Sequence, residues 1–141
     1  MSTRSNIIIV TPDNNIHQFY NHLDGYLSGV GEELRKYLVY SIGLCTRVKK
    51  LSLYDILVEY ISSDDDYEYE CTMDLNAINK IHADVDYTYI IKDGELYYTD
   101  DYDIHNKDIH NKVKTNKELI DYICKDCNKL ALDKQLHDDD E

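Results

Sequence analysis

The sequence has no tryptophan, a single proline and a single phenylalanine, and it lacks long apolar runs. The longest apolar stretches, such as Ile7 to Val10, are far too short to cross a bilayer. The N-terminus shows no basic start followed by an apolar run and a cleavage site, so we predict no signal peptide. The apolar and charged fractions, 43% and 30%, are ordinary for a globular protein and argue against wholesale disorder. We therefore expect a globular protein of the cytoplasm.

Cysteine is also sparse, because the 141 residues contain only Cys45, Cys71, Cys124 and Cys127. This density does not suit a secreted disulfide scaffold and favours a reducing compartment. Cys124 and Cys127 have the spacing of half a zinc site or a redox pair. No second pair of ligands is evident, so we interpret both as ordinary helix residues and predict no metal and no cofactor.

Cations are scarce relative to anions. Fifteen basic residues oppose 28 acidic ones, which leaves a formal net charge of −13. A field of that sign repels nucleic acid and anionic membranes and attracts basic proteins. We therefore expect neither direct nucleic-acid binding nor membrane binding. The 14 tyrosines supply most of the aromatic content, and their amphipathic rings suit either the border of a core or a contact surface.

Five segments have the β-branched or alternating pattern of strands. Thr11-Pro12-Asp13-Asn14-Asn15 predicts a turn between the first two, and Asp93-Gly94 predicts a type I′ turn between the last two. That second turn sets the expected register, with Lys92 opposite Glu95 and, at the open end, Asp86 opposite Asp101. The strands are expected at 6–10, 16–20, 66–75, 84–92 and 95–101.

Three segments have helical spacing. Val30, Leu34, Leu38 and Ile42 predict a helix over about 29–44, and a stripe behind Ser52 predicts a second over 53–61. A capping box of Thr115 and Glu118 predicts the last helix, with a stripe that continues through Cys127 and Leu130. The pentapeptide at 103–107 is repeated at 108–112, and we interpret the repeat as a loop or irregular edge.

These elements predict an α+β fold, an antiparallel sheet of about five strands with two or three helices packed mainly on one face. No linker divides the chain, so we expect one domain over 1–136 and an acidic, disordered tail over 137–141.

The acidic residues are concentrated in one part of the chain. Between Asp64 and Asp103 there are 13 acids against Lys80 and Lys92, so this segment holds −11 of the net charge. On a strand, carboxylates at alternate positions lie roughly 6.6 Å apart, a spacing that can imitate a row of phosphates. A solvated face or a calcium site would give the same composition. If the face binds a partner, the expected contact residues are Asp66, Glu68, Glu70, Asp74, Asp86, Glu95, Tyr97 and Asp101, with Ile90 beside Tyr97 on the outward face of the hairpin.

Catalytic motifs are not legible. The sequence has no P-loop, no dinucleotide fingerprint and no nucleophile elbow. His22 and Asp24 are the alternative site, as a metal-ligating or acid–base pair of a small hydrolase or nucleotide-binding protein. A turn role for Asp24, immediately before Gly25, explains the same residues. A structural or interaction subunit of a larger assembly is a further alternative.

Two short motifs carry a family resemblance. They are Ser2-Thr3-Arg4-Ser5-Asn6-Ile7 and the run from His22 through Asp24, Gly25, Tyr26 and Gly29 to Gly31. The chain resembles a set of uncharacterised proteins of bacteriophages, prophages and plasmids, with the patterns S-T-R-S-x-I and H-W-D-G-Y-x-x-G-x-G. Leu23 stands where that pattern has tryptophan, and the resemblance covers about the first 45 residues.

The resemblance implies an origin in a virus or other mobile element. Accessory genes of such elements often encode small, acidic inhibitors of host defence. We therefore expect a non-enzymatic, anti-CRISPR-like inhibitor with an acidic, nucleic-acid-mimicking surface. Its expected partner is a basic nucleic-acid-binding host protein such as a CRISPR effector.

Overall fold

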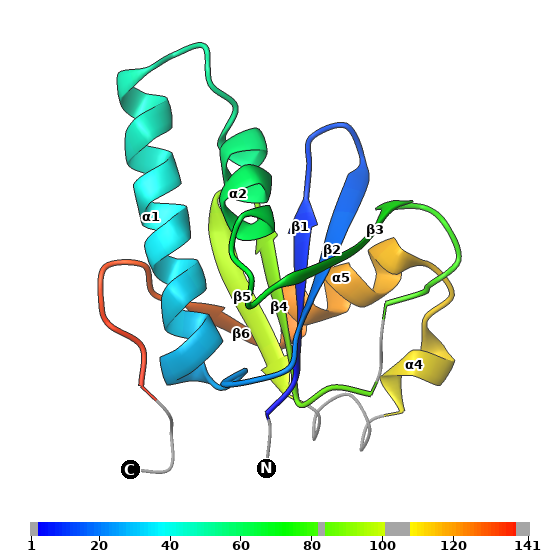
Figure 1. The fold of residues 1–141 in the computed structure, drawn as a ribbon. Helices are drawn as coiled ribbons and strands as arrows, with labels where there is room; N and C mark the ends of the chain where they lie inside the picture. The colour runs from blue at the N-terminus through cyan, green and yellow to red at the C-terminus, as the bar shows by residue number, and fades with distance from the viewer. Residues whose placement is uncertain (1–2, 82–83, 101–107, 138–141) are drawn as a thin grey trace.

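The computed structural model describes residues 3–81, 84–100 and 108–137 and has a six-stranded sheet at its centre (Figure 1). The strands are ordered β3-β2-β1-β4-β5-β6 across the sheet. The fold is thus α+β, as predicted, with one strand more than expected. The strands are β1 (Ser5–Val10), β2 (Asn15–Asn21), β3 (Glu68–Asp74), β4 (Tyr87–Lys92), β5 (Glu95–Asp100) and β6 (Asn128–Leu130).

The sheet is mixed and not purely antiparallel. β1 pairs antiparallel with β2 but parallel with β4, where Ile7 lies opposite Tyr89. Between β2 and β4 the chain forms two helices and the edge strand β3 before it returns beside β1. The prediction of an antiparallel sheet was wrong at this one junction, because parallel pairing between distant segments leaves no turn in the sequence to reveal it.

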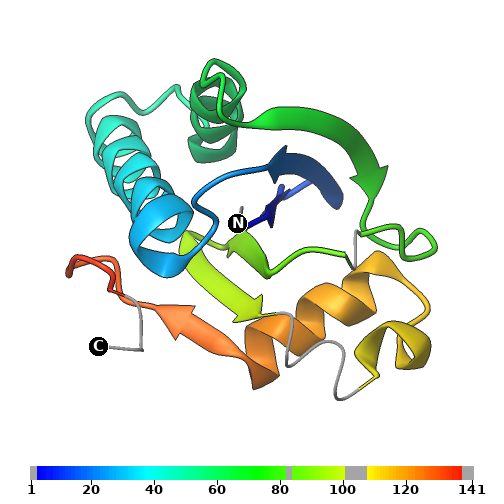
Figure 2. The ribbon, with the colours of Figure 1, turned by 60° about the horizontal axis from the view of Figure 1, so that its bottom comes forward.

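Helices cover both faces of the sheet, which corrects the prediction of one covered face. Figure 2 shows α1 (Glu32–Arg47) and α2 (Leu53–Ser62) on one side of the strands and α5 (Asn116–Asp126) on the other. A π-helical turn at Leu27–Gly31 leads into α1, and the short α4 (Ile109–Lys112) precedes α5.

The central strand β1 explains why both faces are covered. All six of its residues are buried: Ile7 and Ile9 pack in the core under α1 and α2, whereas Ile8 and Val10 pack in the core under α5. Successive strand residues point to opposite faces. A continuous apolar strand therefore requires a cover on each side.

Most local predictions are confirmed. The first two strands form the predicted hairpin, and β4 and β5 have the predicted register, with Lys92 opposite Glu95 and Tyr89 opposite Tyr98. Asp93 and Gly94 both have positive φ, as a type I′ turn requires. The amide of Glu118 donates to Thr115 Oγ1 at 3.2 Å, which confirms the predicted cap of α5.

The last predicted helix is shorter than its apolar stripe. α5 ends at Asp126, and Leu130 lies in β6, opposite Leu96 of β5. The prediction was wrong beyond Asp126 because Leu130 finds its apolar contacts on the sheet, and a three-residue strand leaves no periodicity to detect.

Some predictions concern residues outside the described ranges. Asp101, with its predicted pairing to Asp86, lies there, as do the first copy of the repeated pentapeptide and residues 138–141 of the predicted tail. The second copy of the repeat includes α4. Within the described ranges, no helix is both long and apolar enough to span a membrane.

Candidate partner-binding surface

The edge strand β3 carries the largest group of exposed acids predicted to contact a partner. β3 forms one border of the sheet and pairs only with β2 among the described strands. We call this group, together with the turn that leads into it, the β3 acidic edge. Its exposed members are Asp65, Asp66, Glu68, Glu70 and Asp74.

The alternation of acids with Tyr67, Tyr69, Cys71, Met73 and Leu75 predicts one acidic and one buried face for β3. The buried face is divided between the two sides of the sheet, because Tyr67 packs in the core under α1 and α2 whereas Leu75 packs in the core under α5. Tyr69 is 48% exposed, and its hydroxyl lies 3.2 Å from His17 Nδ1 and also contacts Thr72. Residues three positions apart in a regular strand point to opposite faces, yet Tyr69 and Thr72 meet on one. The register between β2 and β3 shifts at Glu70, and such a bulge reverses the alternation that follows it.

The β4–β5 hairpin does not present its acids as a continuation of this surface. Three strand steps separate β3 from β4 in the sheet. Asp86 Oδ2 accepts the backbone amide of Arg4 at 2.8 Å, and Glu95 Oε2 lies 3.4 Å from Lys129 Nζ. These two carboxylates stabilise the domain itself, so the predicted single acidic face is divided.

The prediction that Tyr97 and Ile90 form an exposed apolar contact surface on the hairpin is also wrong. Ile90 is fully buried in the core beneath α5, and Tyr97 is half-buried against the same core, where burial raises the pKa of its phenol. The outward face expected for this pair is the face that α5 covers. The sequence did not show this, because α5 begins beyond the hairpin and its docking is a long-range contact.

The side chains of His22 and Asp24 in the family motif contact different residues of the protein. His22 Nε2 lies 3.1 Å from Glu68 Oε1, and both side chains are exposed. Asp24 Oδ1 accepts the hydroxyl of Tyr26 at 3.0 Å. The predicted acid–base or metal pair of His22 and Asp24 is therefore not assembled in this structure.

The glycines of the motif shape the entry to α1. Asp24 has φ of 57°, and its carbonyl accepts the amide of Val30 at 2.8 Å. A Cβ on Gly29 would lie 2.1 Å from that carbonyl oxygen, and a Cβ on Gly25 would lie 2.8 Å from the carbonyl oxygen of Thr3. Gly31 closes the buried end of the same turn. A packing role for these glycines accounts for the motif.

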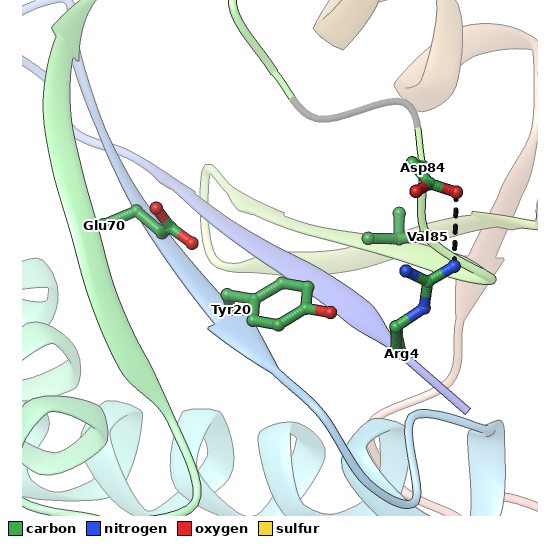
Figure 3. A pocket seen from close by; sticks show the side chains of 5 residues that line it. All are labelled: Arg4, Tyr20, Glu70, Asp84 and Val85. Carbon is green, nitrogen blue, oxygen red and sulfur yellow. Dashed lines mark hydrogen bonds and ion pairs between the residues drawn. The ribbon is translucent and has the colours of Figure 1, made fainter. Parts of the chain in front are cut away.

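A polar hollow of about 220 Å³ lies beside the β3 acidic edge (Figure 3). Its lining residues come from four separate segments: Arg4, Tyr20, Glu70, Asp84 and Val85. Tyr20 from β2 and Glu70 from β3 point toward the side where Arg4 Nη2 lies 3.2 Å from Asp84 Oδ1. Asp84 raises the pKa of the Arg4 guanidinium through its hydrogen bond and its charge. The hollow thus places one cation between carboxylates.

Sequence reasoning missed Arg4, Tyr20 and Asp84 as site residues. Arg4 and Asp84 are eighty positions apart, and the strand pairing of β1 with β4 brings them together. Arg4 stands in the S-T-R-S motif, which was the only available signal. Nothing local to Tyr20 or Asp84 marked them.

Metal and thiol chemistry find little support among these residues. Across the described ranges, no group of three or more His, Cys, Asp or Glu side chains is arranged to hold a metal ion. The four cysteines are free thiols. Burial raises the pKa of Cys124 to about 11, so this thiol stays protonated at neutral pH.

Comparisons with known proteins give no match: neither a family model, nor a curated protein, nor a solved structure is similar to this chain.

Proposed function

We propose that this protein is a non-enzymatic inhibitor that binds the basic groove of a nucleic-acid-handling protein through the β3 acidic edge. The observation that carries the proposal is the exposure of five acids along this edge, around the half-exposed ring of Tyr69. Among the described residues, no basic side chain lies within ion-pair distance of the Asp65 or Asp66 carboxylate.

Position and charge both suit the β3 acidic edge to such a contact. An edge strand presents its side chains without a neighbour on one border, so a groove on a partner can receive them. Carboxylates spaced along a strand supply repeated negative charge, and an aromatic ring among them supplies desolvated contact area. The net charge of −13 steers such a partner inward from a distance.

The finer proposal concerns origin and target. A phage or other mobile element would encode the inhibitor, which would act in the cytoplasm of a bacterial host on a defence protein such as a CRISPR effector. The family resemblance supports the origin, and the acidic edge supports a partner that ordinarily holds nucleic acid.

The test begins with capture of the partner. The tagged protein is incubated with a nuclease-treated bacterial lysate, bound proteins are eluted by a salt gradient, and each is identified by mass spectrometry. We expect a basic nucleic-acid-binding protein that salt releases and that added DNA or RNA displaces. A partner indifferent to both would contradict the proposal.

Paired charge-reversal variants then locate the contact. Glu68→Lys with Glu70→Lys alters the β3 acidic edge, whereas Asp126→Lys with Asp133→Lys alters exposed acids at the end of α5 and beyond β6. Both double variants change the net charge equally. We expect only the first to weaken binding, by roughly tenfold or more. Equal weakening by both variants would show that net charge alone attracts the partner and that the edge is merely solvated.

A further inference from the structure

Three tyrosines on α1 and α2 form an aromatic hollow of about 260 Å³ on the protein surface. They are Tyr37 and Tyr40, one helical turn apart on α1, and Tyr60 near the end of α2. The ring centroids of Tyr40 and Tyr60 lie 5.4 Å apart and those of Tyr37 and Tyr60 lie 6.4 Å apart. Tyr40 is 53% exposed, so the hollow presents ring surface to the solvent. We call it the tyrosine hollow.

Carboxylates lie near Tyr37, one of the three residues of the tyrosine hollow. The hydroxyl of Tyr37 donates to Asp64 Oδ2 at 2.7 Å. Burial, this hydrogen bond and the nearby charges of Asp64, Glu33 and Asp66 raise the pKa of Tyr37 to about 12. The neighbouring Tyr40 and, to a smaller extent, burial raise the pKa of Tyr60. Tyr37 and Tyr60 thus stay neutral at physiological pH, within a negative field.

The neighbouring lysine is directed elsewhere. Lys36 lies one turn before Tyr40 on α1, and its Nζ is 3.9 Å from Glu32 Oε2. The protein's own nearby cation is therefore drawn toward a carboxylate near the start of the helix.

We propose that the tyrosine hollow binds an arginine side chain of the partner, with the guanidinium over the ring faces and the surrounding carboxylates as acceptors. A planar cation stacks on aromatic rings more favourably than an ammonium does, and surrounding anions add to the attraction. The inference rests on the proposed function, because it concerns the same basic partner. Asp64, Asp65 and Asp66 follow the C-cap of α2 and connect the hollow to the β3 acidic edge.

The experiment uses an octa-arginine peptide as the probe and an octa-lysine peptide as its reference. Tyr40→Leu removes the exposed ring but keeps apolar volume, whereas Tyr40→Phe keeps the ring and removes only the hydroxyl. Affinities are measured by fluorescence anisotropy at one fixed ionic strength, and thermal unfolding confirms that each variant folds. We expect Tyr40→Leu to weaken octa-arginine binding roughly fivefold, with a smaller effect on octa-lysine, and Tyr40→Phe to remain within about twofold of the parent.

The outcomes separate this inference from the function on which it rests. Unchanged octa-arginine affinity in Tyr40→Leu, or an equal loss in Tyr40→Phe, overturns the role of the ring. If only the Glu68→Lys, Glu70→Lys variant loses affinity, the result supports binding by the β3 acidic edge and overturns binding by the tyrosine hollow. If only Tyr40→Leu loses affinity, the result supports binding by the tyrosine hollow and overturns binding by the β3 acidic edge. Ring resonances of Tyr37, Tyr40 and Tyr60 that shift with octa-arginine, and not with octa-lysine, would support the hollow directly.

Discussion

One buried ion pair joins the start of α1 to the C-terminal segment. Arg35 donates from Nε and Nη2 to the Glu32 carboxylate at 2.7 and 2.6 Å. The same two side chains hold the segment after β6: Glu32 Oε1 accepts the amide of Leu136 at 2.9 Å, and Arg35 Nη1 donates to the carbonyl of Leu132 at 2.9 Å. Leu136 is buried against the core that α1 covers. Glu32 thus has a structural role, because its carboxylate accepts hydrogen bonds from both Arg35 and the Leu136 amide.

Glu32→Gln should lower stability by about 2 kcal/mol, because the variant removes the charge that Arg35 and the Leu136 amide require. Urea unfolding measures the loss, and Glu59→Gln, at an exposed position of α2, serves as the control. A loss no greater than that of the control would show that the pair contributes nothing to the fold.

The lowered pKa of the Glu32 carboxyl makes the stability of the protein depend on pH. The hydrogen bond from Arg35 lowers the pKa of Glu32 to about 2, from an ordinary value of 4.5. A depressed pKa contributes stability that is present above the unfolded value and is lost as pH falls from 4.5 toward 2. We therefore expect Tm to fall over this window, less steeply in Glu32→Gln than in the parent. Identical pH profiles for the two proteins would contradict this assignment.

At the scale of elements, the connection from β2 into α1 determines how closely α1 approaches the sheet. The loop crosses the start of β1, where the Gly25 amide donates to the Thr3 carbonyl at 2.9 Å, and the buried Tyr89 hydroxyl donates to the Gly25 carbonyl at 2.7 Å. The π-helical turn at Leu27–Gly31 then directs the chain into α1. No side chain fits at the closest approach within this turn.

Two glycines offer a matched test of that claim. At Gly29 an added methyl group would collide with the Asp24 carbonyl at 2.1 Å, whereas at Gly43, within α1, it would meet no atom within 4 Å. We expect Gly29→Ala to lose more than about 2 kcal/mol of unfolding free energy. Gly43→Ala should be neutral or gain up to about 1 kcal/mol, because alanine is the better helix former. Equal stability of the two variants in urea would refute the tight turn.

At the scale of the whole molecule, the dominant property is excess negative charge. Some of the described cations lie in ion pairs: Arg35 and Lys36 contact Glu32, and Lys92 and Lys117 contact Asp121. Much of the remaining charge stands on the β3 acidic edge and in the connection that precedes it. Such an uncompensated field opposes folding through self-repulsion.

Screening should therefore stabilise the protein. We expect Tm to rise by a few °C when NaCl is increased from about 20 to about 300 mM, since the Debye length then falls well below the size of the domain. Differential scanning calorimetry measures the shift. The Asp126→Lys, Asp133→Lys variant, which carries less negative charge, should respond less. A flat or falling Tm in the parent would contradict the argument.

The sequence by itself determined the features that depend on neighbouring residues. Asp93 and Gly94 defined the β4–β5 turn and its register, Thr115 capped α5, and the apolar stripes of α1 and α2 located both helices. The concentration of acids around β3 was also visible. These signals are local, because turn geometry, capping and helical periodicity involve residues only a few positions apart.

The tertiary structure alone decided how these elements combine. It paired β1 with β4, placed α5 over Ile90 and Tyr97, and inserted the bulge at Glu70 that divides the buried residues of β3 between the two faces of the sheet. It also assembled the hollow around Arg4 and the tyrosine hollow. Each of these depends on contacts between segments far apart in the chain, where packing and hydrogen bonding across the sheet outweigh the local pattern.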